Sequence, residues 1–161
     1  MRKIQNAFTL IELMIVIAIL GILAAMISGN FITSLKKGRD ARRKGDLEQI
    51  SRGLEMYYED QKVYPTAVPG KNILATQIID SGSKKIYMEN VPTDPSTGNN
   101  YSYISDGTTY QLYACLENNQ QILPYITSSS MTCTTQCYQP DGKTLTTNGC
   151  IWGIASPNAT P

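Results

Sequence analysis

The 161-residue chain contains no histidine. Histidine is the usual general base near neutral pH, a member of most serine-type triads and the commonest zinc ligand, so its absence removes those chemistries. The sequence also lacks a G-x-S-x-G nucleophile motif and a glycine-rich phosphate-binding loop. We therefore predict that the protein is not an enzyme and that it uses no cofactor.

Excess charge is also absent, because 14 lysines and arginines stand against 13 acidic residues. A dedicated nucleic-acid-binding protein would be strongly basic, so we expect no specific nucleic-acid partner. Eight of the basic residues nevertheless fall within residues 36–62. We interpret this cluster as a solvated or intersubunit face of a helix, with binding to DNA or another anionic surface as the alternative.

Cysteine is missing from the first 114 residues, and four cysteines follow: Cys115, Cys133, Cys137 and Cys150. An even number confined to one polar region predicts two disulfides and an oxidising compartment. Four reduced thiols and a four-thiolate zinc site are the alternatives, although only Cys133 and Cys137 have a spacing typical of a zinc pair. The sequence does not choose among the three possible pairings; we take forward Cys115 with Cys133 and Cys137 with Cys150.

Residues 8–27 form an apolar run interrupted by Thr9 and Glu12. At ~1.5 Å per residue, a helix of this length could cross a bilayer core of ~30 Å. It has no polar face, so lipid or other helices must cover it on every side. A carboxylate in such a helix is unfavourable, by up to ~3 kcal/mol at its centre, so Glu12 needs a partner unless it lies at the membrane interface.

The pattern then becomes one-sided, with apolar residues recurring at spacings of three and four: Leu47, Ile50, Leu54 and Tyr57. This spacing predicts an amphipathic helix, which the Tyr64-Pro65 pair ends. Together the two patterns predict one long helix over residues 8–60, of which residues 8–30 form the part buried in a membrane or in a core of other helices.

The remaining sequence predicts a small antiparallel sheet. Residues 101–105 and 109–116 have strand-like composition and flank Asp106-Gly107, a strong hairpin signal. Residues 72–80 are expected to form a short helix or an irregular connection. Residues 122–126 could form an edge strand around Pro124, and the chain from Ser128 onward is expected to be a loop.

The predicted fold class is therefore α+β, with the second half of the long helix packed against this sheet and a disulfide-rich C-terminal loop region. Residues 61–161 are expected to form the globular domain with its Cys-rich tail. A fragment that starts near Asp46 is expected to be soluble and monomeric.

The start of the apolar run, N-A-F-T-L-I-E-L over residues 6–13, follows a short leader with Arg2 and Lys3. It resembles the class III signal of type IV pilins and pseudopilins, which implies the pilin fold and a leader formed by residues 1–7. The resemblance also implies that prepilin peptidase cleaves between Ala7 and Phe8 and methylates the new amino group of Phe8. In this family the residue before the cut is usually Gly, where this chain has Ala7. The resemblance further implies an assembly role for Glu12, whose carboxylate would pair with the amino group of a neighbouring copy.

The middle of the chain is similar to major pseudopilins of type II secretion and related pilins, through A-R-R-K-G-D-L at residues 41–47, V-P-T-D-P at residues 91–95 and further short blocks ending at Glu117. Some such pseudopilins bind calcium near their final strands. The nearest candidate ligands here are Asp94 and Asp106, although capping a turn and forming the hairpin are the favoured roles for these two side chains.

These resemblances imply a structural subunit of a type IV pilus-like filament, made as a membrane-held precursor and polymerised through its N-terminal helix. A type II secretion pseudopilin is the alternative, and an ordinary anchored or secreted protein is a third possibility. The expected partners are other copies of the chain, prepilin peptidase, a pilus or secretion assembly platform and the membrane. The precursor is expected in the cytoplasmic membrane with its C-terminal domain outside the cytoplasm, and the filament in the periplasm or outside the cell.

Six lysines and arginines within about 20 residues after the apolar run point to the opposite orientation by the positive-inside rule. We give more weight to the leader motif and the cysteines, which predict that the C-terminal domain lies outside the cytoplasm.

Overall fold

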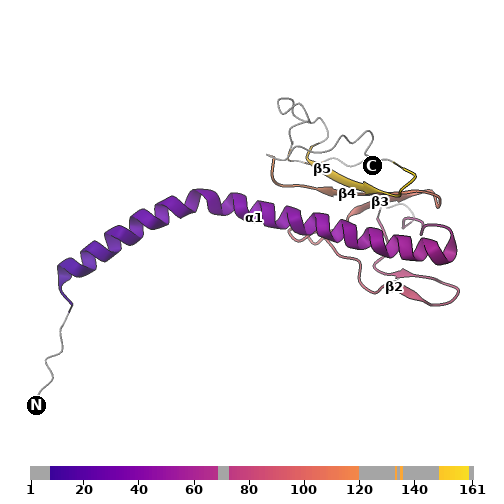
Figure 1. Cartoon of the computed structure of the whole chain (residues 1–161), viewed down its shortest axis with the longest axis horizontal. Coiled ribbons are helices and arrows are strands. Elements are labelled where there is room, and N and C mark those ends of the chain that lie inside the picture. The colour runs from indigo at the N-terminus through magenta and orange to yellow at the C-terminus, as the bar shows by residue number, and fades with distance from the viewer. Residues whose placement is uncertain (1–7, 69–72, 120–132, 134, 136–148, 160–161) are drawn as a thin grey trace, which may run out of the picture. The chain divides into compact units, whose positions relative to one another are not determined.

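The computed structural model describes residues 8–68, 73–119, 133, 135 and 149–159, without the side chains of residues 28–30 (Figure 1). The chain separates into two units, Met1–Leu35 and Lys36–Pro161. One helix, α1, spans Leu10–Gln61. Its end is set by Lys62, which adopts a left-handed conformation with φ 58°, and whose backbone N–H donates to the carbonyl of Tyr58 at 2.8 Å. This geometry closes the last helical turn, as glycine commonly does in other helices.

The domain contains a three-stranded antiparallel sheet in the order β3-β4-β5, formed by Ser102–Ser105, Tyr110–Cys115 and Ile151–Ala155. A separate two-stranded hairpin pairs β1, Ile78–Ile79, with β2, Ile86–Met88. Between β3 and β4, the carboxylate of Asp106 accepts the backbone N–H groups of Thr108 and Thr109, and Gly107 adopts a left-handed φ of 87°. The predicted hairpin therefore forms at Asp106-Gly107.

The core of the domain lies between the second half of α1 and the sheet (Figure 1). Leu47, Ile50 and Leu54 are completely buried and pack in one cluster with Tyr103 of β3 and Leu112 of β4. Burial of a large aliphatic side chain contributes about 1.5–3 kcal/mol, so this stripe accounts for much of the attachment of the helix. The α+β fold class predicted from the sequence is confirmed.

The C-terminal tail contributes more structure than the sequence predicted. The expectation of a loop from Ser128 onward is wrong for β5, which pairs with β4 along its length, from Cys115 opposite Ile151 to Gln111 opposite Ala155. Trp152 of β5 also lies under the ammonium group of Lys44, 4.3 Å from the ring centroid. A short strand within a Thr- and Gly-rich tail gives little periodic signal, so pairing with β4 decided the conformation.

The sequence also gave expectations for two connecting segments, residues 72–80 and residues 122–126. The described residues 73–80 form an irregular connection, one of the two expected alternatives, which ends in the two-residue strand β1; Ile73 forms an isolated bridge with Ser102. The possible strand at residues 122–126 lies outside the described residues.

Tyr113 of β4 lies on the face of the strand opposite Leu112, because successive side chains of a strand alternate between its two faces, and that face is covered as well. Tyr113 is completely buried and packs with Cys133 and Ile151 in a second small cluster. The tail therefore supplies a cover for the outer face of the sheet.

The glycines of α1 give a direct test of how closely the hairpin approaches the helix. A Cβ added at Gly53 would lie 3.1 Å from the terminal methyl of Met88 and 3.2 Å from Cδ1 of Ile78, whereas a Cβ at Gly45 would meet nothing within 4 Å. We expect Gly53→Leu to lower the free energy of unfolding by about 1–3 kcal/mol, because the larger side chain forces the hairpin away.

The matched control is Gly45→Leu, which is expected to raise the free energy of unfolding by up to ~1 kcal/mol through helix propensity alone. Urea unfolding of a fragment starting at Lys36 measures both changes. Equal effects of the two substitutions would contradict the close packing at Gly53.

Candidate functional site

The first turn of α1 is closed by a reciprocal pair of side chains, Thr9 and Glu12. The backbone N–H and the hydroxyl of Thr9 both donate to Oε2 of Glu12 at 2.8 Å, and the backbone N–H of Glu12 donates to the hydroxyl of Thr9 at 3.3 Å. This arrangement is a capping box, which satisfies N–H groups that the first turn of a helix leaves without partners. The T-x-x-E spacing was present in the sequence, but our reading of it did not use Thr9.

Only one oxygen of the Glu12 carboxylate takes part in this cap. Both recorded hydrogen bonds from Thr9 end on Oε2, so Oε1 can accept a further donor without breaking the cap. Because the cap fixes the side chain against the helix start, Glu12 has a defined position before any second molecule arrives.

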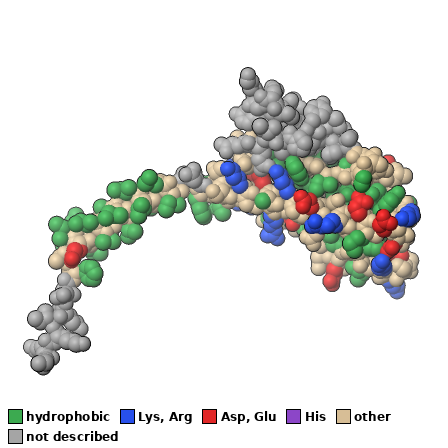
Figure 2. Space-filling model, in the orientation of Figure 1, with side chains coloured by type: hydrophobic (Ala, Val, Ile, Leu, Met, Phe, Trp, Pro, Cys, Tyr) green, Lys and Arg blue, Asp and Glu red, His purple; other side chains and the backbone are tan. Residues whose placement is uncertain are grey.

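No described residue of its own unit covers the helix that follows. Every large apolar side chain described between Phe8 and Ile27 is about half exposed or more, and Phe8 itself is 90% exposed. Figure 2 shows hydrophobic side chains along the visible face of this helix. Leu10–Ile27 is long and apolar enough to cross a membrane. The exposed apolar surface therefore requires lipid or protein around it.

A second cluster, within the domain, centres on the buried guanidinium of Arg43. This group donates to Asp40 at 2.8 Å, to Asp94 at 2.6 and 3.1 Å, to Glu117 at 2.7 Å and to the hydroxyl of Ser96 at 2.6 Å. Arg43 is only 3% exposed, so this cation is compensated by protein groups rather than by water. Part of the basic cluster predicted as a solvated face is therefore an internal connection between α1 and two loops.

Asp40 has a separate task in the same cluster. Its buried carboxylate accepts the backbone N–H groups of Glu117 at 2.9 Å and of Asn118 at 2.8 Å, directly after β4. The chain leaving the sheet is thus fastened to the helix by both a backbone cap and the Arg43 ion pairs. The compact unit that contains the domain begins at Lys36, so a fragment starting near Asp46 would lack both Asp40 and Arg43.

The cluster lowers the pKa values of two carboxyl groups, Glu117 and Asp94. Hydrogen bonds from Arg39, and then from Arg43, lower the pKa of Glu117 to about 2. Burial opposes ionisation of Asp94, but hydrogen bonds from Arg43 and from the Ser96 region hold its pKa well below the usual range.

These contacts also bear on the two calcium candidates. Asp94 is engaged by Arg43 and caps its own turn, and Asp106 caps the hairpin, where backbone and side-chain hydrogen bonds from Thr109 and Thr108 lower its pKa to about 2. Within the described part of the chain, no group of three or more acidic, histidine or cysteine residues could hold a metal ion. The described residues therefore place both carboxylates in turns and do not assemble them into one ligand set.

The tail is joined to the sheet by a disulfide between Cys115, at the end of β4, and Cys133, with Cα atoms 5.5 Å apart. Cys150 is disulfide-bonded as well, and Cys137, its expected partner, lies outside the described residues. The backbone continues the same attachment, because Leu116 donates to the carbonyl of Cys150 at 2.7 Å and Cys150 donates to that of Thr135.

An apolar, capped N-terminal helix whose chain continues into a small α+β domain defines the class of pilin-like subunits. Two protein families match the sequence. The first, described as a prokaryotic N-terminal methylation motif, covers residues 2–28, and the second, type II secretion system protein G, covers residues 30–121. The chain belongs to the type II secretion system protein G family.

Individual relatives agree with the family match. The chain is 36% identical to the type II secretion system core protein G of Vibrio cholerae over 111 residues, which cover 66% of this chain and 75% of the relative. It is 34% identical to the Pseudomonas aeruginosa protein of the same name over 120 residues, covering 70% and 84% of the two chains. No solved structure matches the chain significantly. The family match ends at residue 121, so β5 and three of the four cysteines lie beyond it.

The Arg43 cluster generates a prediction about stability in acid. Because the pKa of Glu117 falls from 4.5 to about 2 on folding, its stabilisation is present above pH 4.5 and is lost as the pH falls toward 2. We expect Glu117→Gln to lower stability at neutral pH and to flatten the loss of stability across this interval.

Arg43→Leu is expected to cost about 3–5 kcal/mol at neutral pH, because it leaves buried carboxylates without a cation. The control is Lys62→Leu, at an exposed ion pair worth about 0–1 kcal/mol. Denaturant unfolding at several pH values measures these effects. An acid profile identical to that of the unmodified protein in Glu117→Gln would refute the assignment.

Proposed function

We propose that this protein is a pseudopilin: a membrane-held precursor that is processed and polymerised into the filament of a type II secretion system. The observation that carries the proposal is the protein G family match over residues 30–121, which adjoins the N-terminal methylation motif. The type IV pilus expected first from the sequence shares that motif, so the motif alone does not separate the two functions. The match over the domain favours the secretion system.

The proposed cycle begins with the apolar helix in the cytoplasmic membrane. Leu10–Ile27 provides a span of suitable length, with Ala7 and Phe8 at its start. Prepilin peptidase would hydrolyse the peptide bond between Ala7 and Phe8, which creates a free amino group, and that nitrogen would then be methylated. An α-amino group has a reference pKa of about 7.7–8.0, so it is largely cationic at neutral pH.

Assembly would transfer the helix from lipid into a core made of other copies of the same helix. This transfer keeps the apolar side chains away from water throughout, which is why a helix without a polar face suits a subunit that leaves the membrane. Charged groups are the ones whose burial in that core costs the most free energy. Oε1 of Glu12 would accept the amino group of Phe8 from a neighbouring copy while Oε2 keeps the Thr9 cap.

The domain would lie outside the cytoplasm, where its disulfides can form. The Cys115–Cys133 bridge and the disulfide of Cys150 fit an oxidising compartment. The proposed role is structural, and the relatives are named as core components of a secretion system.

Processing is tested at the amino terminus of protein taken from cells. The mature chain is expected to begin with N-methylated Phe8, and its formal net charge falls from +1 to −1 because Arg2 and Lys3 are removed. Intact-mass and N-terminal peptide mass spectrometry measure this directly. A mature protein that still begins at Met1 would refute the proposed processing.

Polymerisation is tested with Glu12→Gln in a strain without the unmodified copy. We expect membrane levels to be unchanged and filament yield to fall at least about tenfold, because a buried amino group left without its partner costs about 3–5 kcal/mol. Glu48→Gln, at an exposed position of α1, serves as the control and should assemble normally. Unchanged filament yield in Glu12→Gln would show that this charge does not drive assembly.

The same deletion strain separates the two filament functions. Loss of protein export, restored by the unmodified gene, supports the secretion pseudopilin. Normal export together with lost surface pili would support the pilus instead.

A further inference from the structure

Six basic side chains lie at the start of the domain, within residues 36–44, and the fold divides them into two groups. Three of them are held by ion pairs or a ring contact inside the domain: Arg39, Arg43 and Lys44. The other three are exposed and form no salt bridge with any described residue: Lys36, Lys37 and Arg42. We call these three side chains the outer cations.

The acidic side chains near the outer cations are engaged within the domain. Asp40 is buried against Arg43, and the carboxylate of Asp46 accepts the hydroxyl of Tyr101 at 2.7 Å. Residues 13–39 contain no acidic residue at all. Figure 2 shows Lys and Arg side chains gathered where the domain begins. This part of the surface therefore carries an excess of positive charge, although the whole chain is nearly balanced.

The outer cations point in different directions around α1. Each residue of a helix turns by about 100°, so Lys37 lies about 100° and Arg42 about 240° around the axis from Lys36. The three side chains thus surround the helix instead of forming one face. A flat partner, such as another protein or a DNA duplex, would meet one or two of them. A layer of phosphate groups through which the helix passes would meet all three.

The chain places such a layer next to the outer cations. Exposed apolar residues continue beyond Ile27, at Phe31, Ile32 and Leu35, and α1 continues through them. From Leu10 to Leu35 a helix measures about 39 Å at ~1.5 Å per residue, close to the ~40–45 Å of a bilayer with its headgroups. Lys36 and Lys37 follow directly, at headgroup level when the apolar residues lie in the membrane.

Arg42 belongs to the same layer. It lies about 9 Å further along the helix axis than Lys36, and a long basic side chain can bend along the helix to bring its charge to the membrane surface. The three cations can therefore reach phosphate groups on different sides of one helix.

We propose that the outer cations bind the phosphate groups of anionic phospholipids at the outer surface of the cytoplasmic membrane. Ammonium and guanidinium groups donate strong hydrogen bonds to phosphate oxygens, and their charge favours lipids with net negative charge over zwitterionic lipids. The inference rests on the proposed membrane-held precursor and adds a lipid preference to it. Extraction into a filament has to break these contacts, so anionic lipid helps to retain the subunit in the membrane.

Photo-cross-linking of the full-length processed chain in phosphatidylcholine nanodiscs tests this contact. Two photoreactive lipids are compared, phosphatidylglycerol and phosphatidylcholine, each with the same reactive group next to the headgroup. We expect the phosphatidylglycerol probe to label residues 31–42 at least about fivefold more strongly, the factor that one cation near an anionic surface provides. The preference should fall at high salt, because these charges are exposed to solvent ions. Peptide mass spectrometry locates the labels.

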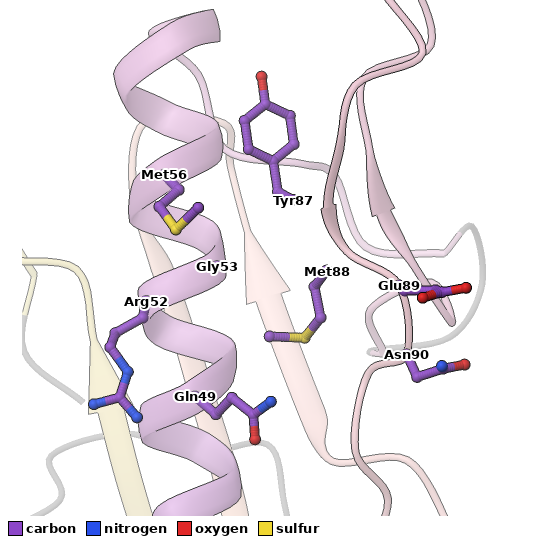
Figure 3. A pocket seen from close by; sticks show the side chains of 8 residues that line it. All are labelled: Gln49, Arg52, Gly53, Met56, Tyr87, Met88, Glu89 and Asn90. Atoms are coloured by element: carbon purple, nitrogen blue, oxygen red, sulfur yellow. The ribbon is translucent and has the colours of Figure 1, made fainter.

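The test variant combines Lys36→Gln, Lys37→Gln and Arg42→Gln, and it is expected to be labelled equally by the two probes. Arg52→Gln is the matched control, because Arg52 is exposed on the same helix and extends away from the β1–β2 hairpin (Figure 3). It lies about 24 Å along the axis from Lys36, too far to reach the same headgroups, so its loss should leave the preference unchanged. Fluorescence of Trp152, the single tryptophan, reports that each domain is folded.

The outcomes separate this inference from the proposed function. Equal labelling of the unmodified chain by the two probes, or full preference in the triple variant, would overturn the lipid contact alone. Equal labelling together with binding of added duplex DNA through the outer cations would assign them to nucleic acid and would also overturn it. Absence of any label on residues 10–35 from either probe would show that the helix does not enter the bilayer and would overturn both proposals.

Discussion

The constraint on which the protein depends is the complete lack of a polar face along Leu10–Ile27. No side chain of the described residues in that unit covers this helix, and its apolar surface is too large to remain in water. The helix therefore has two suitable environments, a bilayer or a bundle of other apolar helices. Under the proposed assembly, a subunit that moves between them would never expose the helix, and the polar groups at its start, Thr9 and Glu12, would set how copies align.

The domain meets the opposite requirement, which is to remain folded in water. It does so with a modest core and with buried charges that are fully paired. Arg43 and Asp40 connect α1 to the turn at Asp94 and to the chain after β4, where Glu117 completes the cluster. Removing one member leaves others buried without compensation, so the cluster acts as a unit. The Cys115–Cys133 disulfide and β5 then attach the tail on the outer face of the sheet.

Much of this organisation was predictable because its signals are periodic or local. The apolar run, the stripe containing Leu47, Ile50 and Leu54, and the Asp106-Gly107 turn each predict their own structure. The strand β5 and the burial of Arg43 were not predicted, because both depend on partners far away in the sequence. A basic residue beside other basic residues gives no sign that three carboxylates will surround it. The Thr9 to Glu12 cap was readable from its spacing alone and was missed.

The N-terminal motif could not show whether the pilus or the secretion pseudopilus is the better assignment, because pilins and pseudopilins share this motif. The domain carried the distinguishing similarity, and the comparison favours the function that the sequence placed second.

An electron cryomicroscopy structure of the assembled filament tests the central claim most directly. The account predicts that the helices of neighbouring copies contact one another around the filament axis over Leu10–Ile27, with the amino group of Phe8 within hydrogen-bonding distance of Glu12 in an adjacent copy. Filaments whose apolar helices remain in lipid, or stand apart from one another, would contradict it.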